Sequence, residues 1–139
     1  MKLDFPDIPS IYTTELTVLI SDINYGNHLS NDRILTYCHE TRIRFLKSLK
    51  YSEVDIEGNG VILSDAWIKY LAEGFHGDKV TINLSIQQES TLALGFYYSL
   101  KLEDGRDLAK AYTKIIGFNY DTRRIAKFSP IFLDKIIKD

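Results

Sequence analysis

Residues 31–49, "NDRILTYCHETRIRFLKSL", carry the pattern that most strongly indicates the fold class of this chain. Apolar side chains recur along this stretch at helical intervals, as the row Ile34, Cys38, Phe45 and Leu49 shows. This spacing predicts a helix of about five turns that buries one apolar stripe. A helix with a single stripe packs most economically across one face of a sheet, so the flanking segments should supply that sheet.

The segments around this helix alternate apolar and polar residues, which is typical of strands with one buried face. Residues 79–87, "KVTINLSIQ", alternate without a break. The predicted strands cover residues 12–20, 60–71, 79–87, 92–102 and 107–120. The last four follow one another through short links, so they should pair largely antiparallel. Residues 129–137, "SPIFLDKII", favour a short closing helix with Ser129 as its cap and Pro130 in its first turn.

This order of elements predicts an α+β protein in which an antiparallel five-stranded sheet wraps around one long helix. The 139 residues, of which 45% are hydrophobic and 26% charged, suit a single domain over residues 1–139. A net charge of −2 gives no reason to expect nucleic acid or a membrane as a partner. No apolar stretch approaches a membrane span or a signal segment, so we expect a cytoplasmic protein. The single cysteine, Cys38, predicts neither an internal disulfide nor a metal cluster.

The joint between the first strand and the helix, "SDINYGNHLSN" at residues 21–31, is rich in side chains that can do chemistry. Asp22, Asn24 and Asn27 are turn formers, and a joint requires a turn. His28 stands among them, just before a helix whose first backbone N–H groups have no partner within the helix. A histidine in that place is also typical of a reactive site, so both interpretations stay open.

Three blocks of the sequence resemble the 4-hydroxybenzoyl-CoA thioesterase-like family of hotdog-fold proteins. In the joint, Asp22 and Asn24 occupy the places of the family's Asp-x-Asp, and His28 that of its Gly-His. Ser30 and Asn31 stand where the family has Asn-Asn. The helix segment "HETRIRFLKSL" resembles the family's Glu-x-Arg with Phe-Leu, and the later "YLAEGFHGDKVTI" resembles its Tyr-Leu and Gly-Asp before a strand. The blocks follow the family's order over most of the chain.

The resemblance implies the hotdog fold and a thioesterase that hydrolyses an acyl-CoA or an acyl-carrier-protein thioester. It also implies a homodimer or homotetramer with the substrate at a subunit interface, and no cofactor or metal beyond the coenzyme A of the substrate. One residue departs from the family, since many members place a catalytic aspartate where this chain has Asn24. An amide cannot ionise, so Asn24 is neither nucleophile nor general base, although it can orient a water or close a turn.

The start of the long helix is the expected place for polarising the thioester carbonyl. Its unpaired backbone N–H groups and positive potential suit the oxyanion that forms during hydrolysis. The resemblance points to the backbone N–H near Asn31 as this donor. We expect His28 either to act as a general base or to hydrogen-bond the carbonyl, with a loop-capping role as the alternative.

Two carboxylates are candidates to replace the missing family acid. Glu40 lies roughly opposite the apolar stripe of the helix, and the resemblance implies that this side approaches the site of a partner subunit, where the matching glutamate of related thioesterases acts as a base or nucleophile. Asp65 shares a predicted strand face with Leu63 and Trp67, and such apolar surroundings would make it a stronger base. Its alternative is a strand-edge aspartate facing water. Arg42 falls within the apolar arc, where an arginine requires a carboxylate partner.

Two other functions fit the same sequence. A hydratase or dehydratase acting on an acyl thioester would use the same fold, although the Gly-Asn-His block before the helix argues against it. A non-catalytic module that binds or senses acyl-CoA would need no acid, which the amide of Asn24 favours. Assays with saturated and 3-hydroxyacyl-CoA separate hydrolysis from hydration, and tight binding without thiol release would indicate the binding module.

Overall fold

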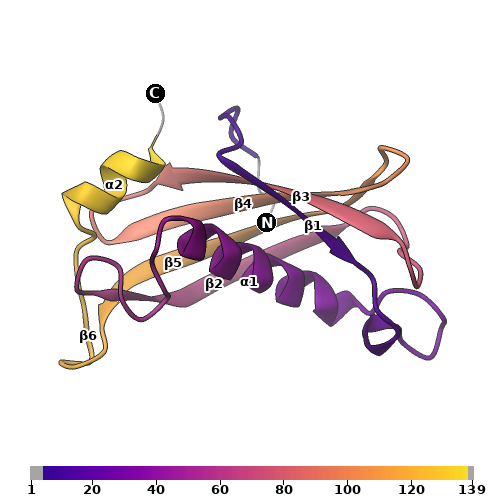
Figure 1. The fold of residues 1–139 in the computed structure, drawn as a ribbon, viewed down its shortest axis with the longest axis horizontal. Helices are drawn as coiled ribbons and strands as arrows, with labels where there is room; N and C mark the ends of the chain where they lie inside the picture. Colours follow the sequence, from indigo (N-terminus) through magenta and orange to yellow (C-terminus); the bar gives the residue numbers. More distant parts are fainter. Residues whose placement is uncertain (1–4, 138–139) are drawn as a thin grey trace.

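The computed structural model describes residues 5–137 as a curved sheet with one long helix across it (Figure 1). The elements follow the chain in the order β1 (Tyr12–Thr17), the 3-10 helix η1 (Ile20–Asp22), α1 (Asn31–Ser48), β2 (Gly60–Tyr70), β3 (Lys79–Gln88), β4 (Ala93–Leu102), β5 (Asp107–Asn119), β6 (Arg124–Ile125) and α2 (Pro130–Ile136). The predicted order of strand, long helix, four strands and short closing helix is confirmed. β1 ends earlier than predicted, because residues 20–22 turn into η1.

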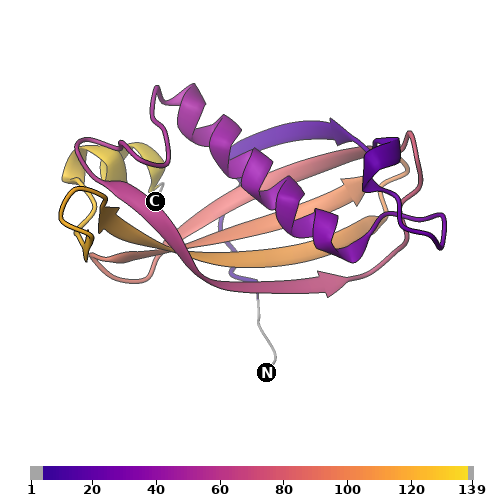
Figure 2. The same cartoon turned by 90° about the horizontal axis from the view of Figure 1, so that it is seen from below.

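The sheet is antiparallel in every pairing, and its strands lie in the order β1-β3-β4-β5-β2, with β6 paired to β5. The prediction of five strands is therefore one short, since β6 adds a strand of two residues. α1 crosses one face of the sheet diagonally (Figure 2). The predicted fold class, a hotdog-type sheet around one long helix, is confirmed.

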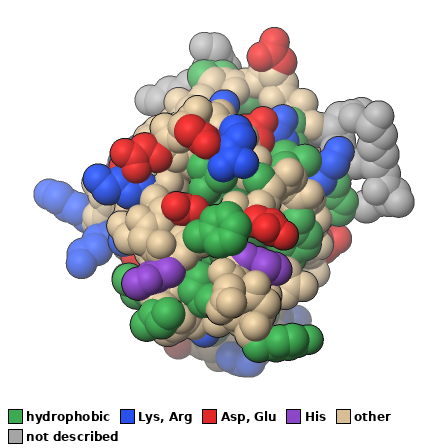
Figure 3. Space-filling model, turned by 90° about the vertical axis from the view of Figure 1, so that its right-hand side faces the viewer, with side chains coloured by type: hydrophobic (Ala, Val, Ile, Leu, Met, Phe, Trp, Pro, Cys, Tyr) green, Lys and Arg blue, Asp and Glu red, His purple; other side chains and the backbone are tan. Residues whose placement is uncertain are grey.

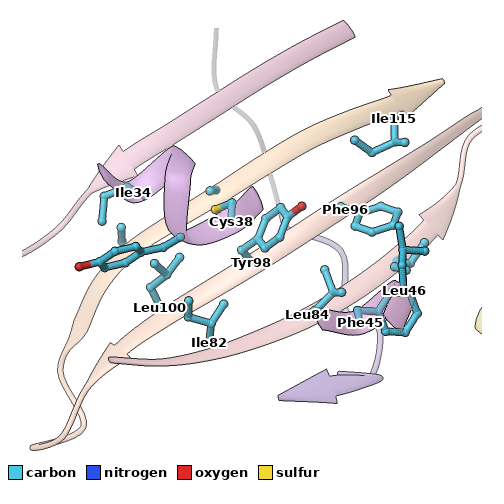
Figure 4. Packing of buried hydrophobic residues seen from close by; sticks show 14 of the residues in the cluster. Ile34, Cys38, Phe45, Leu46, Ile82, Leu84, Phe96, Tyr98, Leu100 and Ile115 are labelled. Atoms are coloured by element: carbon cyan, nitrogen blue, oxygen red, sulfur yellow. The ribbon is translucent and has the colours of Figure 1, made fainter. Parts of the chain in front are cut away.

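The core lies between α1 and the sheet (Figure 4). From α1 it contains Ile34, Cys38, Phe45 and Leu46, and from the sheet Ile82 and Leu84 of β3, Phe96, Tyr98 and Leu100 of β4, and Ile115 of β5. Burial of one such large apolar side chain stabilises a fold by about 1.5–3 kcal/mol. Burial also raises the pKa of the Cys38 thiol, so this cysteine is a core residue and not a reactive thiolate.

One charged side chain belongs to the buried face of α1. Arg42 Nε donates to Glu53 Oε2 at 2.6 Å, and Arg42 Nη1 donates to the Tyr98 hydroxyl at 3.3 Å. The other Glu53 oxygen lies 2.7 Å from His39 Nε2, and Tyr98 shares a hydrogen bond with Thr113. We refer to these five residues as the Arg42 cluster. The prediction that Arg42 takes a carboxylate partner is confirmed, and every buried side-chain nitrogen and oxygen in the described part of the chain has a hydrogen-bond partner.

α2 lies at the end of the sheet away from η1 (Figure 1). The Ser129 hydroxyl oxygen accepts a hydrogen bond from the Ile131 N–H at 3.1 Å, and Pro130 begins the helix, as predicted. Phe132 and Ile136 bury its inner side. No helix within residues 5–137 is both long enough and apolar enough to cross a membrane.

Candidate functional site

Two loops meet at one end of the molecule, where histidine, acidic and apolar side chains gather on the surface (Figure 3). β1 ends beside the start of β3, because the two strands pair antiparallel. The β1–α1 loop (residues 18–30) and the β2–β3 loop (residues 71–78) therefore leave the sheet side by side. A backbone hydrogen bond from Leu29 N to Gly74 O, 2.7 Å long, joins them.

The buried side chain of Asp22 stabilises the β1–α1 loop through hydrogen bonds. Its carboxylate is buried and accepts hydrogen bonds from the Leu19 N–H at 2.9 Å and the Tyr37 hydroxyl at 2.7 Å. Its other oxygen lies 3.7 Å from Arg33 Nε. The backbone carbonyl of Asp22 accepts from Ser30 N at 2.8 Å. With both carboxylate oxygens engaged, Asp22 is a structural residue, which agrees with its turn-forming interpretation.

Asn24 closes the turn of the same loop. Its side-chain oxygen accepts from the Gly26 N–H at 2.9 Å and from the His28 N–H at 3.4 Å. Its backbone N–H donates to the His28 carbonyl at 3.0 Å. Asn27 adopts a φ of 68° in this turn, in the left-handed region that asparagine tolerates. The turn-forming interpretation of Asn24 thus has direct structural support, because its side-chain oxygen is already occupied.

A cavity of about 310 Å³ opens beside this turn, at the start of α1, and we refer to it as the α1 cavity. Its polar lining consists of Asn24, His28, Asn31, Tyr70 and Glu73, and its apolar lining of Leu29, Ile34, Ala72, Gly74 and Leu108. The cavity thus brings together three of the predicted site residues, namely Asn24, His28 and Asn31. Within residues 5–137, no group of three or more His, Cys, Asp or Glu side chains is placed to hold a metal ion.

The start of α1 lacks a side-chain cap. The hydroxyl of Ser30, in the capping position, instead donates to the Asp32 carboxylate at 2.5 Å. This hydrogen bond is the main reason why the pKa of Asp32 lies below its ordinary value. No group in the described part of the chain accepts a hydrogen bond from the backbone N–H of Asn31. Asn31, whose unpaired backbone N–H stands at the positive end of an 18-residue helix, is therefore among the residues that line the cavity.

His28 lines the α1 cavity with one ring nitrogen free. Its Nδ1 lies 3.3 Å from the Leu29 carbonyl oxygen, which orients the ring when Nδ1 carries the proton. In that tautomer Nε2 is an acceptor, and it has no hydrogen-bond partner among residues 5–137. A Cβ on Gly26 would lie 3.2 Å from Asn24 Oδ1 and 3.4 Å from Nε2, so the glycine packs closely against both side chains. The loop contact through Nδ1 and a chemical role through Nε2 are compatible in this geometry.

Two further polar residues line the cavity: Tyr70, which the sequence marks only as part of the family's Tyr-Leu block, and Glu73, which the sequence pattern does not single out. Tyr70, the last residue of β2, donates its hydroxyl hydrogen to the Asn31 carbonyl at 2.9 Å and ties β2 to the start of α1. Glu73 lies in the β2–β3 loop and is the one carboxylate among the residues that line the cavity. Glu73 could have been assigned to the site from the pairing of β1 with β3, because that pairing sets the two loops side by side.

Glu40 and Asp65, the two predicted carboxylates, do not line the α1 cavity. Glu40 is exposed and accepts from Arg44 Nε at 2.6 Å, one turn further along α1. Asp65 is exposed and accepts from Ser64 Oγ at 2.6 Å. The expectation of apolar surroundings for Asp65 is wrong, because a β-bulge between Leu63 and Asp65 breaks the alternation of β2, an edge strand. A catalytic role for either carboxylate stays a prediction.

A model of the thioesterase-like superfamily matches residues 18–136 of the chain. No curated protein matches it in sequence. A solved 1,4-dihydroxy-2-naphthoyl-CoA thioesterase from Synechocystis is 24% identical, with a TM-score of 0.82 over 90% of this chain and 94% of that chain. The resemblance to hotdog-fold thioesterases inferred from the three sequence blocks is confirmed.

Two proteins from Staphylococcus aureus share the fold as well. One, solved in complex with CoA, is 22% identical, with a TM-score of 0.80 over 96% of this chain and 85% of that chain. The other, a DHNA-CoA thioesterase, is 20% identical, with a TM-score of 0.75 over 88% of this chain and 80% of that chain. At this level of identity the likeness shows a common fold, and the substrate of this chain must be argued from its own site.

Proposed function

The chain belongs to the thioesterase-like superfamily and is a thioester hydrolase, and we propose that it hydrolyses an acyl-CoA, or an acyl group on a carrier protein, in the α1 cavity. One observation carries this proposal. The lining of the cavity combines Asn31, whose backbone N–H has no partner in the described part of the chain, with His28 and a set of apolar side chains. Such a combination suits a substrate with a reacting carbonyl and an acyl group. The CoA-bound Staphylococcus aureus structure, which has the same fold, supports coenzyme A as the thiol of the substrate.

In the proposed reaction, the backbone N–H of Asn31 donates to the thioester oxygen. Negative charge develops on that oxygen as the carbonyl carbon is attacked, and the positive end of α1 stabilises it. Loss of one such donor typically slows a reaction by roughly 10²–10³-fold. Because the donor is a backbone group, replacement of the Asn31 side chain leaves it in place.

His28 has two roles open to it in this reaction. When its proton is on Nδ1, facing the Leu29 carbonyl, the free Nε2 accepts a proton from water. When the proton is on Nε2, that nitrogen donates a hydrogen bond to the thioester carbonyl and polarises it. Proton transfer by a positioned side chain typically contributes about 10²–10⁴-fold to a rate, so either role makes the ring important.

The acyl group lies against the apolar lining in this proposal. Ile34 and Leu108 are each 2% exposed and Leu29 is 7% exposed, so the lining is continuous with the core. Removal of an acyl group from water against these side chains supplies about 25 cal/mol for each Å² that is buried. We also propose that the enzyme works as a homodimer or homotetramer, the assembly that the family resemblance implies.

Thiol release from a panel of acyl-CoA thioesters and acyl-carrier proteins tests the proposal. The wild type should release thiol from at least one saturated substrate. Ala72→Phe, which fills the cavity with a ring, should abolish release, while Thr122→Phe, in the exposed turn between β5 and β6, should keep it. Circular dichroism should show both variants folded. Absence of thiol release from every saturated substrate, or conversion of 3-hydroxyacyl-CoA without thiol release, would contradict the proposal.

A further inference from the structure

We propose that Glu73 is the carboxylate that activates the attacking water in the α1 cavity, an assignment that rests on the proposed function. Glu73 is the one carboxylate among the residues that line the cavity with His28 and Asn31. Hydrolysis of a thioester consumes a water molecule whose proton must pass to a base. A carboxylate within reach of the reacting carbonyl can take that proton, and Glu73 is placed in the right cavity to do so.

The backbone around Glu73 is held in place on both sides. The N–H groups of the two preceding residues donate to the Leu108 carbonyl, at 3.0 and 3.2 Å. The carbonyl of the following residue, Gly74, accepts from Leu29 N at 2.7 Å, which fastens the segment to the loop that carries His28. A Cβ on Gly74 would lie 3.3 Å from the Leu29 side chain, so glycine permits this close approach. The two loops are thus fixed relative to each other where both line the cavity.

The Glu73 carboxylate is free, whereas the other carboxylates of the two loops and of the first turn of α1 are engaged. It forms no hydrogen bond or ion pair within residues 5–137. Asp22, Asp32 and Asp78 each accept hydrogen bonds from neighbouring groups. Asn24, in the place of the family acid, uses its side-chain oxygen to close a turn. Glu73 is therefore the acidic side chain of this region that remains available to a water molecule.

In the proposed step, the Glu73 carboxylate removes a proton from water while the water oxygen bonds to the thioester carbonyl carbon. The electron pair of the carbonyl moves to its oxygen, where the Asn31 N–H stabilises it. The tetrahedral intermediate then collapses, the C–S bond breaks, and the sulfur leaves with its electron pair. The proton held by Glu73 passes to the sulfur, so the products are a carboxylic acid and a free thiol.

Steady-state thiol release by Glu73→Gln and a matched control tests the assignment. Glutamine keeps the shape of the side chain but cannot accept a proton. The control, Glu103→Gln, makes the same change in an exposed turn that follows β4 at the same end of the sheet but does not line the cavity. We expect kcat of Glu73→Gln to fall by about 10²-fold or more, with KM and the melting temperature little changed. Glu103→Gln should retain the wild-type rate.

A second variant distinguishes the loss of a catalytic base from a distortion of the loop as the cause of a low rate. In Glu73→Ala, added formate should restore part of the rate, because a small carboxylate can occupy the space that the side chain leaves. Formate should not restore His28→Ala. Failure of formate to restore Glu73→Ala would contradict the role of a base, even if kcat of Glu73→Gln is low.

Variants of the two competing carboxylates, Glu40 and Asp65, provide the result that would overturn the assignment. If Glu40→Gln or Asp65→Asn abolishes thiol release while Glu73→Gln keeps the wild-type rate, Glu73 is not the base and the proposed function stands. If the wild type itself releases no thiol from any acyl-CoA or acyl-carrier protein, the proposed function and the assignment of Glu73 fail together.

Discussion

Two polar regions lie along α1, and they differ in how completely their hydrogen bonds are satisfied. The Arg42 cluster lies in the second half of the helix, where Arg42 is 6% exposed and pairs with Glu53 at 2.6 Å. The α1 cavity lies at the first residue of the helix. There the Asn31 N–H, His28 Nε2 and the Glu73 carboxylate have no hydrogen-bond partner within the described part of the chain.

The difference separates charges that hold the fold together from groups that are available to a substrate. Removing one partner of a buried ion pair costs several kcal/mol, about 3–5, because it leaves an uncompensated charge in the interior. A group that binds a reacting molecule must instead be free and already oriented before the substrate arrives. Changes in the Arg42 cluster should therefore alter stability, and changes in the α1 cavity should alter rate.

Glu53→Ala should cause the greatest change, a loss of stability. This change leaves the Arg42 guanidinium buried without a countercharge, so the free energy of unfolding should fall by about 3–5 kcal/mol. Urea denaturation measures the loss as a lower midpoint at an unchanged slope. Lys101→Ala, which removes an exposed contact with Asp107, should lower the free energy by at most about 1 kcal/mol. Equal losses in the two variants would contradict a structural role for the Arg42 cluster.

The next largest effect is the loss of rate in His28→Ala. Thiol release should fall by about 10²-fold, which corresponds to about 2.7 kcal/mol in the activation barrier, while the urea midpoint stays close to that of the wild type. His76→Ala is a matched control, because His76 is an exposed histidine of the β2–β3 loop that does not line the cavity. An unchanged rate in His28→Ala would show that the ring serves only to cap the loop.

A smaller effect is the dependence of stability on pH that the Arg42 cluster confers. Burial alone would raise the pKa of Glu53, but the hydrogen bonds and charges of Arg42 and His39 outweigh burial and lower it. A carboxyl whose pKa is lowered by folding stabilises the fold above its unfolded pKa, near 4.5, and loses that contribution as the pH falls through the folded value. Urea midpoints should therefore show that the gap between wild type and Glu53→Gln narrows below pH 4.5. A gap that persists unchanged in acid would contradict this account.

The smallest effect compares the serines that precede the two helices. The Ser129 hydroxyl accepts from the Ile131 N–H, whereas the Ser30 hydroxyl donates to the Asp32 carboxylate. Ser129→Ala should therefore cost about 1 kcal/mol of unfolding free energy, and Ser30→Ala less than about 0.5 kcal/mol. Urea midpoints of the two variants check the difference. A cost for Ser30→Ala as large as that for Ser129→Ala would mean that Ser30 caps α1 and that the donors at the cavity are not free.

Most of the fold can be predicted from the sequence, because the signals that define it are local. The apolar stripe within residues 31–49 predicts α1 with an end only one residue from the observed one, at Ser48. Ser129 followed by Pro130 predicts the start of α2 in the same way. Arg42 within the stripe predicts a carboxylate partner but not which one, since Glu53 comes from the loop that follows the helix.

The site can be predicted only in part, because some of its residues reach the cavity only through the tertiary structure. Asn24, His28 and Asn31 are close in sequence, and the turn before α1 carries them to one cavity. Glu73 reaches that cavity from the loop beyond β2, and only the pairing of β1 with β3 brings it there. The alternation of apolar and polar residues wrongly predicts apolar surroundings for Asp65, because the bulge in β2 leaves no trace in that alternation.

If the reacting end of the substrate lies at the start of α1, a binding measurement should locate it there. Amide proton–nitrogen NMR spectra would be recorded while a non-hydrolysable acyl-CoA thioether is added to the wild type. We expect the largest shifts at the amides of His28, Asn31 and Gly74, with small shifts in the Arg42 cluster. Largest shifts at the other end of the sheet, around Leu133 of α2, would contradict it.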